Sequence, residues 1–214
     1  MRLWWRLLRF GFRLLYNEMA FTYDLVSHVV SLGAWRCWQR AALKHMNVQP
    51  GAPVLELAHG TGNLQLDLNN AGYRVYGYDL SPYMGRIAKA KLKKAKCAIR
   101  LARGRAQQLP FPSGTFEAVV STFPTDFIVA PQTLREVHRV LTEGGQFIIV
   151  PNGVLTSGGV IETGIERLYR ITGQRDGAAT DIGSFFADFG FEAVALQEAC
   201  PRSLAQVIVA RKKV

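Results

Sequence analysis

The sequence predicts an α/β fold, in which a mostly parallel sheet carries helices on both faces and follows an N-terminal helical extension. Short apolar runs rich in Val, Ile, Tyr and Phe alternate along the chain with longer segments whose apolar residues recur at helical spacing. Turns rich in glycine and proline separate these segments. Because strands that alternate with helices pair in parallel, ligands are expected beyond the carboxyl ends of the strands.

Each predicted element begins or ends at a local signal. Ser81 followed by Pro82 is typical of a helix N-terminus, because serine caps free N–H groups and proline fits the first turn. Gly144 and Gly145 end another helix before a buried strand. The expected helices cover 18–46 (interrupted at 31–33), 62–71, 81–94, 134–141, 161–169 and a segment ending at 185–189. The expected strands are 54–57, 73–78, 98–102, 116–121, 147–150, 192–196 and 206–210.

Composition and charge narrow the function classes. The chain has 214 residues, 49% hydrophobic and 20% charged, which suits one globular domain with its own core. Cys37, Cys97 and Cys200 are odd in number and far apart, which argues against a disulfide framework and favours a reducing, cytoplasmic compartment. The net charge of +10 favours an anionic partner, but no nucleic-acid-reading module is present. The lysines of 89–96 are expected on a solvated helix face.

The first sixteen residues predict an amphipathic basic helix. Arg2, Arg6, Arg9 and Arg13 fall on one stripe of such a helix, and most other residues, including two tryptophans, are apolar. This pattern is typical of a helix that lies in a membrane interface without crossing it. The alternative is a helix that docks on the domain or on a second copy, which would form a homodimer.

A nucleotide site is predicted at the turn that follows the first strand. Gly60 and Gly62 would let the backbone approach a ligand closely. Asp79 lies 23 residues after Glu56, at the end of the second strand, where a carboxylate can accept hydrogen bonds from both ribose hydroxyls. Glu56 directly before the turn suits a cationic amino-acid group better than a pyrophosphate.

Four segments resemble, in order, the motifs of class I S-adenosylmethionine (SAM)-dependent methyltransferases: VLELAHGTGN, GYRVYGYDLSPYM, LPFPSGTFEAVVSTF and LREVHRVLTEGGQFIIV. The stretch from Tyr23 to Arg36 is similar to the segment preceding the core in ubiquinone/menaquinone biosynthesis methyltransferases. The resemblance implies a Rossmann-like seven-stranded sheet. The expected divisions of the chain are the amphipathic helix (1–17), a helical cap segment (18–49) and the SAM-binding domain (50–214). Within this domain, glycines and an apolar helix at 153–177 suit a lid over the acceptor.

By this resemblance, Glu56 would address the amino group of SAM and Asp79 its ribose. The implied cofactor-binding residues are Glu56, Ala58, His59, Gly60, Thr61, Gly62, Asp79, Leu80, Met84, Ala106, Gln107, Ser121, Thr122 and Phe123. The chain departs from the family pattern at Ala58, which replaces the first glycine, and at Arg105, which replaces a common acidic residue. Alanine fits at this position only if its φ is negative and its methyl clears the ligand.

The resemblance implies methyl transfer from SAM to a hydrophobic, membrane-resident acceptor, either a quinone precursor or a phospholipid head group, with no metal. The cofactor supplies the electrophile, and the protein positions the reactants. A general base is needed only if the acceptor must lose a proton, and the candidates are His59, Asp126 and Tyr23. The alternatives are a methyltransferase for a small soluble acceptor and a SAM-binding relative without catalysis.

Overall fold

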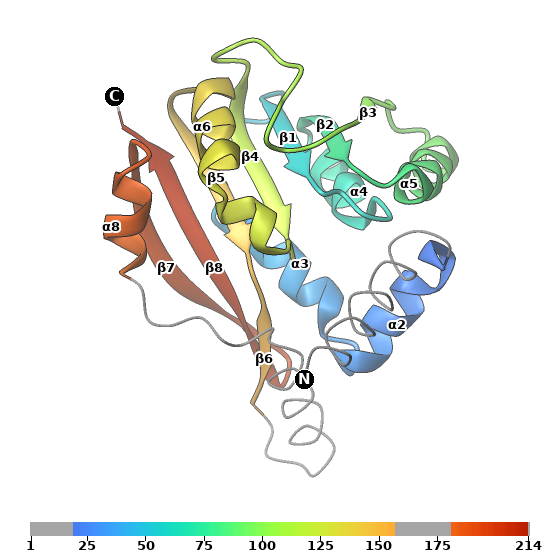
Figure 1. The fold of residues 1–214 in the computed structure, drawn as a ribbon. Coiled ribbons are helices and arrows are strands. Elements are labelled where there is room, and N and C mark those ends of the chain that lie inside the picture. The colour runs from blue at the N-terminus through green and yellow to red at the C-terminus, as the bar shows by residue number, and fades with distance from the viewer. Residues whose placement is uncertain (1–18, 157–180, 214) are drawn as a thin grey trace, which may run out of the picture.

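The computed structural model describes residues 19–156 and 181–213, which form one eight-stranded sheet with helices on both faces (Figure 1). The strand order is β3-β2-β1-β4-β5-β8-β6, and β7 also pairs with β8. The strands are β1 (Pro53–Leu57), β2 (Arg74–Asp79), β3 (Leu101–Arg103), β4 (Phe116–Thr122), β5 (Leu141–Val150), β6 (Gly153–Leu155), β7 (Phe191–Cys200) and β8 (Ser203–Lys212).

The sheet reverses its direction of growth next to β1. Strands β1 to β5 pair in parallel, whereas β8 runs antiparallel to β5, β6 and β7. The chain builds outward from β1 through β2 and β3, then crosses to the other side of β1 to form β4 and β5. The carboxyl ends of β1 and β4 therefore frame the crevice in which sheets of this kind bind ligands.

Helices cover the two faces of the sheet over separate apolar clusters. On one face, Trp38 of α3 and Leu64 of α4 pack on the strands, and on the other face, Leu134 of α6 and Phe186 of α8 do so. The helices are η1 (Ala20–Thr22), α2 (Tyr23–Val30), α3 (Trp35–Lys44), α4 (Asn63–Asn70), α5 (Pro82–Lys94), η2 (Asp126–Val129), α6 (Pro131–Val140) and α8 (Ile182–Ala187). Because α3 contacts β5 and β8, it forms part of a covering layer.

The predicted fold class is confirmed, and all seven predicted strands are present. The eighth strand, β6, occupies the first residues of the predicted lid and pairs with β8 beyond the end of its pairing with β5. The predicted N-cap is also confirmed, since Ser81 Oγ accepts a hydrogen bond from the Met84 N–H at 3.3 Å. The predicted helices at 1–17 and 161–169 and the rest of the lid lie outside the described residues.

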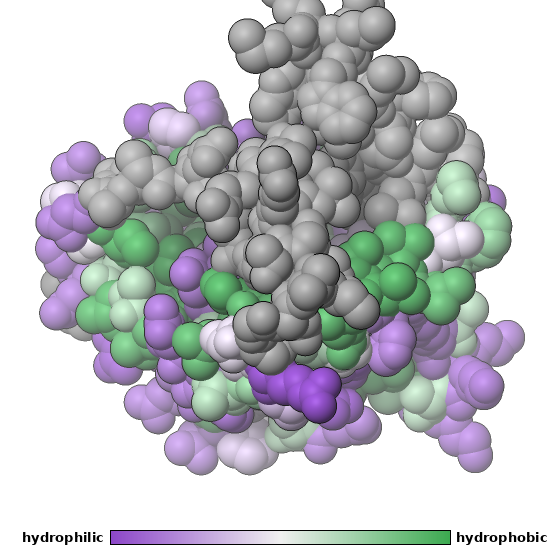
Figure 2. Space-filling model, turned by 90° about the horizontal axis from the view of Figure 1, so that it is seen from below, coloured by the Kyte–Doolittle hydropathy of each residue, from purple (hydrophilic) through white to green (hydrophobic). Residues whose placement is uncertain are grey.

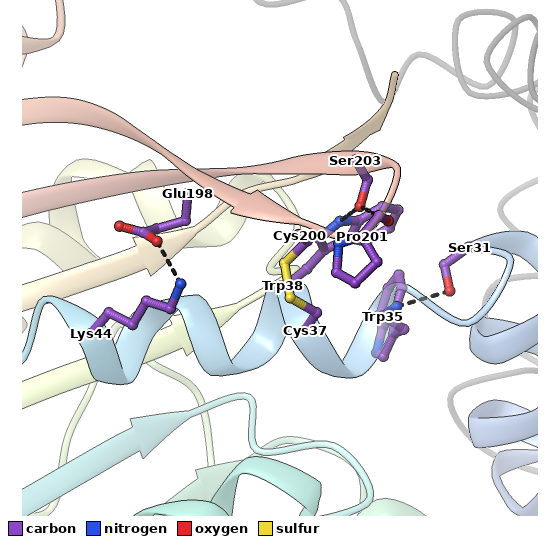
Figure 3. Close-up of a disulfide and its surroundings, with 9 residues drawn as sticks. All are labelled: Ser31, Trp35, Cys37, Trp38, Lys44, Glu198, Cys200, Pro201 and Ser203. Atoms are coloured by element: carbon purple, nitrogen blue, oxygen red, sulfur yellow. Dashed lines mark hydrogen bonds and ion pairs between the residues drawn. A yellow bond between two sulfur atoms is a disulfide. The ribbon is translucent and has the colours of Figure 1, made fainter. Parts of the chain in front are cut away.

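The expectation that no disulfide is present is wrong. Cys37 of α3 and Cys200 at the end of β7 form a disulfide, with their Cα atoms 6.0 Å apart despite a sequence separation of 163 residues (Figure 3). Trp38 Nε1 donates a hydrogen bond to Ser203 Oγ at 2.9 Å beside it. Cys97 is the free cysteine. Sequence distance says nothing about contact in a folded chain, so the cysteine pattern gives no support for a reducing compartment.

Candidate cofactor site

A cavity of about 680 Å³ opens at the carboxyl ends of β1, β2 and β4. Its volume lies within the range of pockets for small molecules and cofactors. It is lined by Tyr23, Ala58, Gly60, Tyr78, Asp79, Leu80, Ser81, Pro82, Met84, Arg103, Gly104, Arg105, Ala106, Gln107, Thr122, Phe123, Pro124, Thr125 and Phe127. The cavity thus lies at the crevice that the strand order predicts.

The turn between β1 and α4 folds through left-handed backbone. Ala58 has φ = +54°, Gly60 +54° and Gly62 +81°. The Ala58 N–H donates to the Tyr78 carbonyl at 2.8 Å, which joins the turn to β2. A Cβ at Gly62 would lie 2.8 Å from the Ala88 Cβ, so only glycine fits there without a shift. The negative φ that would suit alanine is not found at Ala58, and this residue adopts a conformation that favours glycine.

The Asp79 carboxylate holds the glycine turn and the start of α5 through hydrogen bonds to their backbone N–H groups. Its Oδ2 accepts from the Gly60 N–H at 2.9 Å, and its Oδ1 accepts from the Ser81 N–H at 2.7 Å. These bonds fix the carboxylate on the cavity wall. A carboxylate has about four acceptor positions, so Asp79 can still accept hydrogen bonds from the hydroxyls of a bound ligand.

Glu56 and His59 are buried behind the turn and do not line the cavity. Gln65 Nε2 donates to Glu56 Oε2 at 2.8 Å, and burial raises the pKa of Glu56 to about 8. His59 Nδ1 lies 2.9 Å from the Gly60 carbonyl, which can only accept, so Nδ1 carries the proton. Burial lowers the pKa of His59, although the Asp79 carboxylate opposes this effect.

A polar network ties α2 to the glycine turn and to α5. Asp24 Oδ1 accepts from Thr61 Oγ1 at 2.6 Å and from Asn63 Nδ2 at 2.9 Å. Asp24 Oδ2 accepts from Lys91 Nζ at 2.5 Å, and Lys91 also donates to Asn63 Oδ1 at 2.8 Å. Burial would raise the pKa of Asp24, but these hydrogen bonds and the lysine charge lower it. Lys91 therefore differs from the solvated lysine that the sequence predicts.

Aromatic side chains form the wall of the cavity nearest α3. The rings of Phe123 and Trp35 stack with centroids 3.8 Å apart and planes 23° apart. Tyr23 meets Trp35 edge to face at 6.2 Å. Because Tyr23 and Phe123 both line the cavity, this cluster presents an apolar, aromatic surface to whatever binds there.

The structure brings ten of the sequence-predicted site residues together on the cavity: Tyr23, Ala58, Gly60, Asp79, Leu80, Met84, Ala106, Gln107, Thr122 and Phe123. The others lie behind or beside it. Thr61 and Gly62 hold the turn, as described above. Ser121 is buried and its Oγ donates to the Leu57 carbonyl at 2.9 Å, which joins β4 to β1. Asp126 is exposed at the first position of η2.

Sequence reasoning missed several cavity residues. Phe127 follows the fourth strand closely, so its position after a strand end could have indicated it. Arg103 directly follows the predicted end of the third strand, so the same signal could have indicated it. Trp35 supports Phe123 from a distant helix, and no spacing rule could have paired the two rings.

The fold and the site define a class I methyltransferase architecture. The chain superimposes on the [4+2]-cyclase SpnF with a TM-score of 0.66 and 18% identity, covering 85% of this chain and 82% of that one. For the geranyl diphosphate C-methyltransferase of Streptomyces coelicolor A3(2), the TM-score is 0.62, the identity 15% and the coverage 83% and 79%. At such identities the likeness shows the fold alone.

The chain belongs to the ubiE/COQ5 methyltransferase family, whose model matches residues 12–159. It is 35% identical over 143 residues to the demethylmenaquinone methyltransferase of Symbiobacterium thermophilum, covering 64% of this chain and 57% of that protein. It is 31% identical over 144 residues to the ubiquinone/menaquinone biosynthesis C-methyltransferase UbiE of Geobacter sp. (strain M21), covering 64% and 61%. The matches thus span less than two thirds of these relatives' length.

Proposed function

We propose that this protein is a SAM-dependent methyltransferase that methylates a quinone precursor. The observation that carries the proposal is the position of Asp79. Its carboxylate lies on the cavity wall at the end of β2, held by the glycine turn and with acceptor positions remaining for ribose hydroxyls. Family membership and the names of the curated relatives support the same activity.

The residues around the cavity fit SAM. Asp79 would hold the ribose, the backbone of Ala58 and Gly60 would contact the same end of the cofactor, and Leu80 and Met84 would lie beside the adenine. SAM supplies an electrophilic methyl group when bound. The chain's contribution is to orient both reactants and to exclude water with its aromatic wall.

The acceptor would occupy the apolar side of the cavity. The stacked rings of Trp35 and Phe123 offer a flat hydrophobic surface suited to a quinone-like ring. Of the three candidate bases, Tyr23 is the one that lines the cavity, so we propose it as the group that contacts the acceptor. His59 is buried behind the turn and Asp126 is exposed on η2, so neither has a comparable position.

The acceptor is proposed to reside in a membrane, which the protein would reach from the cytoplasmic side. No helix of the described ranges, 19–156 and 181–213, is long and apolar enough to cross a bilayer. We propose that the contact is peripheral, because the arginine stripe and tryptophans of residues 1–16 suit anionic lipid. Vesicle sedimentation of the intact chain and of a chain without residues 1–16 tests this contribution.

A SAM-binding relative without catalysis is the second candidate, because the chain departs from the family pattern at two positions of the cavity. Ala58 has a left-handed backbone where the family has glycine, and Arg105 lines the cavity where the family commonly has an acidic residue. Turnover with a demethylated quinol in detergent separates the two candidates. A small soluble acceptor is the remaining alternative, and the same assay with water-soluble phenols addresses it.

Calorimetric titration with SAM and S-adenosylhomocysteine tests the cofactor assignment. Asp79→Ala should weaken binding of both by at least about tenfold, since hydrogen bonds to a charged group contribute about 1.5–3 kcal/mol each. Asp188→Ala, an exposed aspartate at the end of α8, is the matched control and should bind like the wild type. Unchanged affinity in Asp79→Ala would refute the assignment.

A further inference from the structure

An apolar stripe is exposed along η1 and α2. Phe21, Leu25 and Val29 recur every four residues and are 77%, 66% and 59% exposed. Residues at this spacing lie on one side of a helix. Met19, Val26 and Leu32 are also exposed and extend the stripe. We call these six residues the α2 apolar face. Figure 2 shows hydrophobic residues gathered on the right of the underside, where Figure 1 places α2.

The α2 apolar face is held outward by the polar side of the same helix. Ser27 is 4% exposed, and Asp24 accepts hydrogen bonds from Thr61 and Asn63. The helix thus turns Ser27 and Asp24 toward the protein and leaves Leu25 and Val29 toward solvent, although an ordinary surface helix buries its apolar residues. Contiguous exposed apolar residues of this kind mark a binding surface.

The charge beside this face identifies the partner. Helix α5 packs against η1, and Lys91 of α5 pairs with Asp24 of α2. From Pro82 to Lys94, helix α5 contains no acidic residue and exposes several basic ones. The exposed basic residues are Arg86, Lys89, Lys93 and Lys94. An apolar helix face flanked by cations is complementary to the interface of an anionic bilayer, where apolar side chains enter and lysines meet head groups.

We infer that the α2 apolar face, with the basic side chains of α5, is a docking surface for anionic phospholipid. Tyr23 lies on the same helix and lines the cavity, as do Pro82 and Met84 of α5. Docking through these two helices therefore brings the cavity to the lipid surface. This consequence for acceptor access rests on the proposed function, whereas the docking itself does not.

Sedimentation of the full chain with vesicles tests the inference. One set of vesicles contains phosphatidylglycerol and phosphatidylcholine, and the other contains phosphatidylcholine alone. The wild type should sediment with the anionic set, less at high salt. Replacing Phe21, Leu25 and Val29 by Gln should weaken this binding by about tenfold or more, because each removed side chain loses apolar burial. Replacing Lys94, the exposed lysine next to Lys91 around the α5 helix, by Gln should weaken it by about fivefold.

The matched control replaces Val194 and Leu196, which are exposed on β7, by Thr and should sediment like the wild type. The inference is overturned if the wild type stays in the supernatant, or if the Gln variants sediment as the wild type does. It is also overturned if the wild type elutes as a dimer in gel filtration and the triple variant elutes as a monomer. The partner of this face would then be a second copy of the chain. SAM titration of each variant separates the two proposals. Loss of vesicle binding concerns the docking surface, whereas loss of SAM binding concerns the proposed function.

Discussion

Asp24 of α2 accepts a hydrogen bond from the Thr61 hydroxyl of the glycine turn at 2.6 Å. One hydrogen bond thus joins the helix that precedes the sheet to the loop at the candidate cofactor site. The same carboxylate pairs with Lys91, which reaches it from α5. The turn is therefore held from both sides by side chains that lie outside the glycine motif itself.

Replacing Asp24 by Ala should loosen this turn. The Asp24 side chain is 41% exposed, so solvent screening limits the loss of stability to about 0.5–1 kcal/mol. SAM affinity should fall several-fold, because the turn must then be ordered on binding, and amide exchange in α2 should rise. Asp24→Asn, which keeps an oxygen acceptor for Thr61, should recover part of the affinity. Equal affinity in all three proteins would contradict a positioning role.

Replacing Ala58 by Gly should leave stability unchanged or raise it by up to about 1 kcal/mol. A left-handed backbone costs an L-residue about 1–2 kcal/mol, which exceeds the extra chain entropy of glycine, about 0.5–1 kcal/mol. Ala71→Gly is the control, since Ala71 has φ = −76° and should lose about 0.5–1 kcal/mol. Urea denaturation measures both, and an equal loss in the two variants would rule out strain at Ala58. SAM binding should be kept or tightened.

These residues show where sequence reasoning works and where it fails. Asp79 and Gly60 were predictable, because a strand, a turn and a following strand place them through local rules of spacing. The pairs Trp35–Phe123 and Asp24–Lys91 join residues far apart in the chain, and their contacts depend on how whole helices pack. Cys37 and Cys200 show the same limit, since their spacing argued against the bond that the fold makes.

Breaking the disulfide should lower thermal stability without displacing the cofactor site. In the chain-entropy account, a crosslink across 163 residues contributes about 3–5 kcal/mol, which corresponds to about 10 °C in Tm for a chain of this size. Lys44–Glu198 and Trp38–Ser203 still hold α3 on the β7–β8 hairpin (Figure 3), so SAM affinity should stay the same. Cys37→Ser is compared with Cys97→Ser, which should melt like the wild type. Equal Tm values for Cys37→Ser and the wild type would contradict a stabilising contribution from this bond.

The buried Glu56 carboxyl should lower the free energy of unfolding as pH rises. Burial raises the pKa of its carboxyl from 4.5 to about 8 in the folded state. Between these values the folded chain keeps a proton that the unfolded chain releases, so the unfolded state is favoured progressively as pH increases. The slope approaches about 1.4 kcal/mol per pH unit within this window, and it vanishes above the folded pKa, where both states are ionised.

Glu56→Gln should remove this component of the pH dependence. Glutamine is neutral throughout, has nearly the same shape, and its carbonyl can accept the hydrogen bond that Gln65 Nε2 donates to Glu56. The variant should therefore match the wild type near pH 5 and exceed it in stability near pH 8. Urea denaturation across pH 5–9 measures the difference, with Glu192→Gln, an exposed glutamate of β7, as the matched control. Parallel curves for Glu56→Gln and the wild type would mean that Glu56 is already ionised in the folded protein at neutral pH.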